Sequence, residues 1–193
     1  LVSIPNGAEV LAFLKFENST TPVEEQPDVE IIAVGLGPQA DRGYGVMAEG
    51  LKASIYEKWL KPLESEENST LLLAISLLHP KSVGFAELRS ANPLDSPKLT
   101  ANFFKEPEDV EMILKGIEFI TKLIKTPPFK AVNAEFHDIP IPPCEKFQFA
   151  SENYWKCAIR TFSLSFHHQV ATCKAGSEHN SVVDSKLKVH GVK

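Results

Sequence analysis

Two adjacent histidines, His167 and His168, precede Cys173 in the stretch LSFHHQVATCKAG of residues 164–176. Imidazole and thiol groups can bind a metal ion, can form a nucleophile–base pair, or can act singly as a general base. Both groups also occur as ordinary packing residues. The neighbouring sequence limits these alternatives.

The spacing argues against a metal site and weakens a nucleophile pair. The segment around the two histidines predicts an extended strand, in which adjacent side chains point to opposite faces, so His167 and His168 would not share an ion. Cys144, Cys157 and Cys173 form no Cys-x-x-Cys or zinc-finger pattern. Catalytic cysteine and histidine residues usually lie far apart along a chain, unlike Cys173 and its neighbours. We therefore predict no metal site.

A general base is the remaining chemical role for this segment. A histidine at the end of a strand can accept a proton near neutral pH, because histidine titrates in that range. Residue types alone favour a half-buried histidine whose hydrogen bonds are satisfied, and they favour Cys173 as a small buried packing residue. On local grounds both interpretations of His168 stay open.

The elements that would position this segment are strands and helices in irregular order. The expected strands are 9–16, 29–36, 71–78 and 83–89, with the last two paired as a hairpin and with a loop at 90–100. The expected helices are 51–63, 107 to the Thr126-Pro-Pro stop, and 151–161, followed by an extended segment at 162–171. Because no βαβ alternation occurs, we predict an α+β fold with a largely antiparallel sheet flanked by helices.

Composition excludes some partners. The 193 residues carry 20 Lys+Arg against 25 Asp+Glu, a net charge of −5, which argues against nucleic-acid binding. No apolar run is long enough to cross a bilayer, so we predict no membrane span. The chain begins at Leu1 and ends at Lys193 in sequence typical of a domain interior, and we expect both ends to be cuts through a longer chain.

Three features favour a secreted or luminal protein. Asn18 and Asn68 each open an Asn-Ser-Thr triplet, the acceptor pattern for N-glycosylation, in stretches that indicate surface loops. A disulfide between Cys144 and Cys157 is possible, and disulfides persist in oxidising compartments. We therefore expect an extracellular or secretory-pathway location.

An ordered set of motifs carries a family resemblance. The motifs are His79-Pro-Lys-Ser-Val-Gly-Phe-Ala-Glu-Leu-Arg-Ser-Ala-Asn-Pro93, Pro143-Cys144 before Tyr154-Trp-Lys-Cys157, His168-Gln-Val-Ala-Thr-Cys-Lys-Ala-Gly176, Val182-Val-Asp184 and Leu187-Lys-Val-His-Gly191. In this order they resemble the C-terminal, substrate-side region of the GMC (glucose–methanol–choline) oxidoreductases. The insect branch that contains glucose-dehydrogenase-like and ecdysone-oxidase-like proteins is the most similar.

The resemblance implies an alcohol oxidoreductase that depends on FAD. It implies that His168 takes the hydroxyl proton of a small alcohol, such as a sugar or a sterol, while a hydride passes to the flavin. His167 is a candidate substrate contact. No Gly-rich dinucleotide fingerprint occurs in the chain. We therefore expect residues 1–193 to be a fragment of one substrate-binding domain without the FAD-binding Rossmann part, inactive and free of FAD by itself.

The motif around His168 departs from the family pattern, which is His-Pro-Val-Gly-Thr-Cys-Lys-Met-Gly. Gln169 replaces proline, Ala171 replaces glycine, Ala175 replaces methionine, and Val83 stands where an arginine is common. Ala171 would restrict the backbone if the family glycine has a positive φ. These changes support an alternative, a GMC-like protein that has lost catalysis and serves as a binding or structural partner. The substrate, the electron acceptor (oxygen or a quinone) and the oligomeric state stay open.

Overall fold

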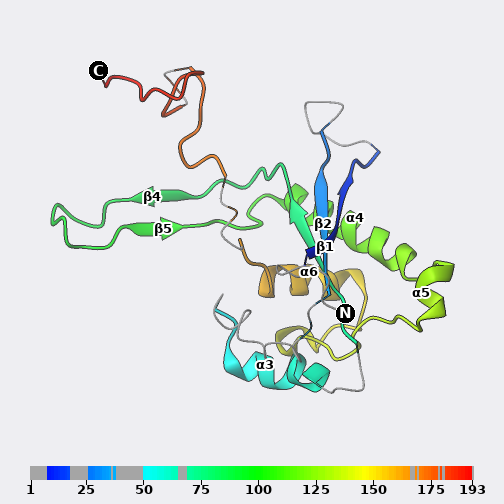
Figure 1. The fold of residues 1–193 in the computed structure, drawn as a ribbon. Coiled ribbons are helices and arrows are strands. Elements are labelled where there is room, and N and C mark those ends of the chain that lie inside the picture. The colour runs from blue at the N-terminus through cyan, green and yellow to red at the C-terminus, as the bar shows by residue number, and fades with distance from the viewer. Residues whose placement is uncertain are drawn as a thin grey trace. The chain divides into compact units, whose positions relative to one another are not determined.

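The computed structural model of the chain describes residues 8–17, 26–35, 37, 50–64, 69–165, 168, 170–177, 179 and 181–192. The chain divides into two compact units, Leu1–Phe162 and Ser163–Lys193. Every helix and strand that the structure names lies in the first unit (Figure 1). Helices are combined with strands that pair antiparallel, so the predicted α+β class is confirmed.

The main sheet has three strands in the order β1 (Ala8–Leu14), β2 (Val29–Val34) and β3 (Leu72–Leu77). Both pairings are antiparallel, and Ile31 at the centre of β2 lies opposite Ala12 on one side and Ile75 on the other. Val29 and Ile31 are buried, as a central strand with one covered face requires. The apolar runs predicted these three strands, because side chains that pack on a sheet must be contiguous in sequence.

The helix α4 (Pro107–Leu123) packs against β2 and β3, beside which it runs in Figure 1. Its start is set by Pro107 in the first turn and by two acidic residues that favour a helix N-terminus. Its buried face presents Val110, Ile113 and Ile120. At Gly116 a Cβ atom would lie 2.9 Å from Cγ2 of Ile75, so this glycine permits the close approach of helix and sheet.

The predicted hairpin between residues 71–78 and 83–89 is wrong. β3 pairs with β2, whereas β4 (Phe85–Glu87) pairs with β5 (Lys98–Thr100). β5 lies inside the segment 90–100, which was expected to be a loop. The connection after β3 does not turn back, because Lys81 and Ser82 donate their backbone N–H groups to the buried carboxylate of Asp109 on α4. These bonds direct the chain into the β4–β5 ribbon (Figure 1).

The helix α6 (Glu152–Thr161) contacts α4 and carries a second core. Ser151 caps it, accepting the N–H of Tyr154 at 3.2 Å. Cys157 on α6 forms a disulfide with Cys144 in the 3-10 helix η2 (Pro142–Cys144), with an S–S distance of 2.06 Å. Cys144 is fully buried in a cluster with Ile141, Tyr154 and Ala158.

The remaining elements are short. They are α3 (Ala53–Trp59), the 3-10 helix η1 (Lys61–Glu64) and α5 (Pro127–Ala131). The single helix predicted over 51–63 is thus two elements, separated at Leu60 where Pro62 cannot donate a helical hydrogen bond. Among the residues that the structure describes, no helix is both long enough and apolar enough to span a bilayer.

Candidate active site

The proposed base, His168, lies in the second unit and not on a strand. Its backbone N–H donates to the carbonyl oxygen of Ser165 at 2.8 Å. The prediction of an extended strand over 162–171 is wrong for the residues described there, since none of them lies in a strand. The side chain of His168 is exposed.

The neighbouring histidine cannot be compared with it. His167 lies outside the described residues, as do the predicted glycosylation acceptors Asn18 and Asn68. The described residues of 162–171 form no strand, so strand geometry does not separate the two histidines. The roles of His167, Asn18 and Asn68 stay predictions.

The backbone after His168 carries an unusual conformation. Ala171 has a φ of 60°, in the left-handed region that residues with a Cβ rarely adopt. This is the position where the sequence motif has glycine in the resembling family. Thr172 and Cys173 then form a turn. Cys173 is a free cysteine and is exposed, so the expectation that it packs in a core is wrong.

A small hydrogen-bonded structure follows, which we call the clasp (residues 174–176, 181–184 and 188–190). The N–H of Gly176 donates to the carbonyl of Val183 at 2.9 Å, and the N–H of Val182 donates to the carbonyl of Lys174 at 2.8 Å. The N–H of His190 donates to the carbonyl of Val182 at 3.1 Å. Val183 bridges both sides and is buried. Sequence patterns indicated only a short strand pair or an extended arm here.

Asp184 closes the turn at one end of the clasp. Its Oδ1 accepts the N–H groups of Lys186 at 2.8 Å and of Lys188 at 2.9 Å. These two bonds hold the pKa of the Asp184 carboxyl below its ordinary value, and the bond from Lys188 has the larger effect. The charge of His190 lowers the pKa further. The carboxylate thus acts as a structural acceptor, a role that an Asp beside a strand end can suggest but not identify from sequence.

The N-termini of the two longest described helices do not suit a dinucleotide. α4 begins with Glu108 and Asp109 in its first turn, and α6 has Ser151 capping it and Glu152 following. A pyrophosphate at either end would meet carboxylates, whereas phosphate sites need free N–H groups at a glycine-rich turn. Neither of these two N-termini therefore forms a phosphate site. Among the described residues there is also no cluster of three or more His, Cys, Asp or Glu side chains that could hold a metal.

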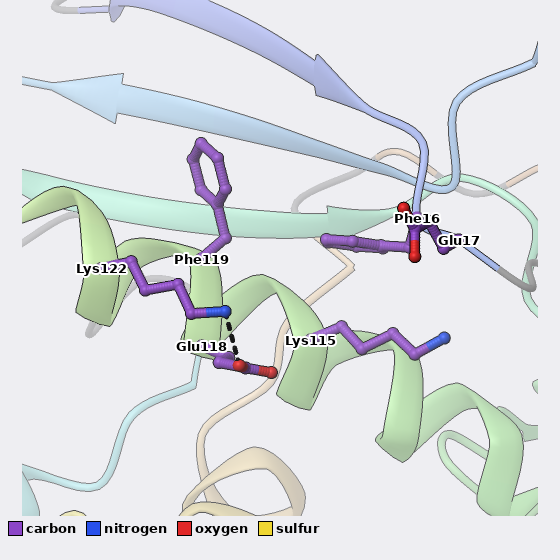
Figure 2. Close-up of a pocket in the computed structure, with 6 residues that line it drawn as sticks. All are labelled: Phe16, Glu17, Lys115, Glu118, Phe119 and Lys122. Atoms are coloured by element: carbon purple, nitrogen blue, oxygen red, sulfur yellow. Dashed lines mark ion pairs between the residues drawn. The ribbon is translucent and has the colours of Figure 1, made fainter.

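A shallow pocket lies on the first unit, between the end of β1 and α4. It is lined by Phe16, Glu17, Lys115, Glu118, Phe119 and Lys122 (Figure 2). Glu118 and Lys122 pair with each other at 2.7 Å, and Lys115 Nζ lies 6.0 Å from the centre of the Phe16 ring. Three of the four charged side chains at this pocket are thus engaged in surface contacts, and its lining contains no histidine.

Comparison with known proteins identifies the relatives of this chain. The family model described as GMC oxidoreductase matches residues 80–193. The chain is 37% identical over 133 residues to a glucose dehydrogenase (FAD, quinone) of Drosophila pseudoobscura pseudoobscura. The aligned residues make up 68% of this chain and 21% of that protein.

The chain is also similar to an ecdysone oxidase and to an alcohol dehydrogenase. An ecdysone oxidase of Spodoptera littoralis is 31% identical over 147 residues, which cover 76% of this chain and 23% of the oxidase. An alcohol dehydrogenase (acceptor) of Pseudomonas putida is 34% identical over 121 residues, covering 63% and 21% of the two chains. The chain thus spans about a fifth of the length of these relatives.

Proposed function

Because the chain belongs to the GMC oxidoreductase family, we propose that it forms the substrate-side part of an FAD-dependent oxidoreductase that acts on CH–OH groups. The family match over residues 80–193, which includes His168 and the clasp, carries this proposal. The names of the relatives include a glucose dehydrogenase, an ecdysone oxidase and an alcohol dehydrogenase, all of which support a small alcohol as substrate. A sugar and a sterol are both compatible with this class.

His168 is the proposed base. Its neutral ring accepts the hydroxyl proton of the alcohol at its unprotonated nitrogen, as the carbon–hydrogen bond breaks and a carbonyl forms. FAD, when bound, would supply the oxidising power as the hydride acceptor. The exposure of its side chain, which leaves the ring open to an incoming substrate, supports His168. Its backbone N–H is held by Ser165, which limits the position of the ring.

The FAD itself is assigned to other parts of the protein. The N-termini of α4 and α6 present carboxylates, and the contribution that we assign to this chain is the proton acceptor and the surrounding loop. In line with that division, we propose that the 193 residues alone bind no FAD and oxidise no alcohol. A flavin absorbance band that copurifies with this chain would contradict this part of the proposal.

The base is tested in the FAD-loaded native protein that contains these residues. His168→Ala should slow alcohol-driven flavin reduction by about 10²–10⁴-fold, because that is the usual contribution of a positioned general base. His179→Ala, at an exposed histidine of the same unit, is the matched control and should leave the reduction rate unchanged. An unchanged reduction rate in His168→Ala overturns the assignment.

A second candidate is a GMC relative without catalysis that acts as a binding or structural protein. The conformation of Ala171 favours it, because a φ of 60° strains the segment that carries the base. Gln169, in place of the family's proline, removes a rigid residue beside His168. If no alcohol in a panel of sugars, sterols and aliphatic alcohols reduces the bound flavin, this candidate is preferred.

We also propose a secreted or luminal location. The Cys144–Cys157 disulfide supports it, since such bonds persist in oxidising compartments. Asn18 and Asn68 are the proposed glycosylation sites. Expression in insect cells, followed by glycosidase treatment, should reduce the apparent mass, and the double variant Asn18→Gln, Asn68→Gln should lack that shift. Protein recovered only from the cytosol, with both asparagines unmodified, would contradict the proposal.

A further inference from the structure

The ring of His190 joins two parts of the clasp. Its Nε2 atom lies 3.1 Å from the carbonyl oxygen of Gly176 and 3.0 Å from Oγ of Ser181. The two partners are separated from His190 by 14 and 9 residues along the chain. Ser181 Oγ lies in turn 2.6 Å from the carbonyl oxygen of Ser177. The imidazole is therefore at the centre of a short chain of hydrogen bonds.

The chemistry of the partners determines where the protons lie. A carbonyl oxygen can only accept, so the single hydroxyl hydrogen of Ser181 goes to Ser177. The carbonyl of Gly176 can likewise only accept, so Nε2 of His190 must carry a hydrogen. This Nε2–H is shared between Gly176 and Ser181. The Ser181–His190 pair is consequently not a nucleophile with its base, because the nitrogen facing the hydroxyl is already protonated.

The position of this crosslink relates it to His168. Residues 170–177, which follow His168, are all exposed, and Ala171 among them has a positive φ. Burial therefore contributes little to the order of this loop. What holds its C-terminal end is the clasp, through the backbone bonds of Lys174 and Gly176 and the side chain of His190. Of these, the His190 bond is the one that a side-chain substitution can remove.

We propose that His190 is a positioning residue. Through its Nε2–H it fixes Gly176, and thereby the end of the loop that presents His168. This inference rests on the proposed function, in which His168 is the base. A base must be held close to its productive geometry, and loss of one supporting bond far from the reaction is enough to slow catalysis.

Two variants separate the hydrogen bond from the ring. In His190→Phe a ring of similar shape remains but cannot donate, whereas His190→Gln places an amide N–H near the position of Nε2. In the FAD-loaded protein, His190→Phe should lower the rate of flavin reduction by about tenfold, the effect of one lost hydrogen bond, with little change in KM. His190→Gln should restore most of the rate. Equal rates in the two variants would overturn the proposal.

Readouts on the chain itself do not depend on activity. Nitrogen-15 NMR of the histidine rings should find His190 protonated at Nε2, and a ring protonated only at Nδ1 overturns the proposal without any variant. Amide hydrogen exchange of Gly176 and Val182 should accelerate in His190→Phe and not in His190→Gln. If His168→Ala abolishes flavin reduction while His190→Phe equals His190→Gln, the proposed base stands and the positioning role fails. If His168→Ala has no effect, the proposed function fails first.

Discussion

Asp109 offers the sharpest test of how the family-matched region is attached to the sheet. Its side chain is 3% exposed. Its Oδ1 accepts the N–H of Lys81 and its Oδ2 accepts the N–H of Ser82, both at 2.8 Å. Because the two donors lie 28 and 27 residues away, the carboxylate fixes the segment that leads from β3 into β4. Asp109→Asn keeps the size of the side chain but replaces one of the two acceptors by an NH₂ donor.

The magnitude follows from these two bonds. A hydrogen bond to a charged group contributes about 1.5–3 kcal/mol, and a buried donor that loses its acceptor costs about 1–3 kcal/mol. In Asp109→Asn the amide oxygen keeps one of the two hydrogen bonds, now without a negative charge. The amide NH₂ group faces the other backbone N–H, and two donors cannot form a hydrogen bond. We therefore expect the free energy of unfolding to fall by about 2–4 kcal/mol, a large share of the 5–15 kcal/mol typical of domains.

The matched control is the neighbouring carboxylate. Glu108→Gln makes the same chemical change in the same helical turn, but its side chain is 59% exposed and lies 3.8 Å from Lys81 Nζ. A surface pair of this kind contributes about 0–1 kcal/mol. Urea unfolding followed by circular dichroism gives both values, and hydrogen exchange of the Lys81 and Ser82 amides reports the local effect. Equal unfolding midpoints for the two variants would refute the reasoning.

Three further predictions concern other supports. Replacing Cys144 and Cys157 by Ala should lower the free energy of unfolding by about 3 kcal/mol, as expected for a loop of sequence separation 13, and thermal unfolding should then be insensitive to reductant. Ala171→Gly should relieve about 1–2 kcal/mol of strain from the left-handed backbone, offset by about 0.5–1 kcal/mol from the greater conformational freedom of glycine in the unfolded chain. Amide hydrogen exchange in residues 170–176 should therefore slow, and faster exchange would contradict this prediction. Backbone hydrogen bonds lower the pKa of Asp184 from a usual 3.8. The Lys186 and Lys188 amides should therefore be fully protected from hydrogen exchange above that pH, and this protection should be lost as the pH falls through the pKa of the folded state. Asp184→Asn should make the protection nearly independent of pH.

Local signals predicted α4 and α6, but neither the break after α3 nor the short helix α5. α4 begins at Pro107 as expected, and its buried face carries Val110, Ile113 and Ile120. α6 begins next to the expected start at residue 151, where Ser151 is the N-cap and needs only a donor three residues ahead. Such elements are determined by residues within a few turns of one another, so a single sequence contains the necessary information.

Strand partners were harder to predict, because pairing is not local. Residues 71–78 and 83–89 are neighbours in sequence, which favoured a hairpin. The structure instead uses Asp109, far along the chain, to hold the intervening Lys81 and Ser82. A lone Asp in the first turn of a helix indicates only a favourable charge at the helix N-terminus. Its second role as an acceptor for a distant loop has no sequence signature.

In the candidate site, too, some features were predictable from local sequence and others depend on distant residues. The motif around His168 located the proposed base, and it also located Ala171, whose φ of 60° is the positive value that the family glycine suggested. Neither the hydrogen bond from His168 N–H to Ser165 nor the exposure of Cys173 followed from it, since the segment was expected to be extended and Cys173 to be buried. His190 before a glycine indicated turn chemistry alone, because its partner Gly176 is distant in the sequence.

The loop that carries His168 is therefore bounded by two anchors of different physical kinds. Before it, α6 is held in its own unit by the Cys144–Cys157 disulfide and a buried core. After it, the clasp is held by backbone hydrogen bonds and the His190 ring, with Val183 as its buried residue. A covalent anchor with a core resists global unfolding, whereas a largely exposed hydrogen-bonded anchor can open locally at a lower free energy. Changes at the clasp should thus alter the position of the base without changing the unfolding midpoint of the first unit, and that separation makes the two anchors experimentally distinguishable.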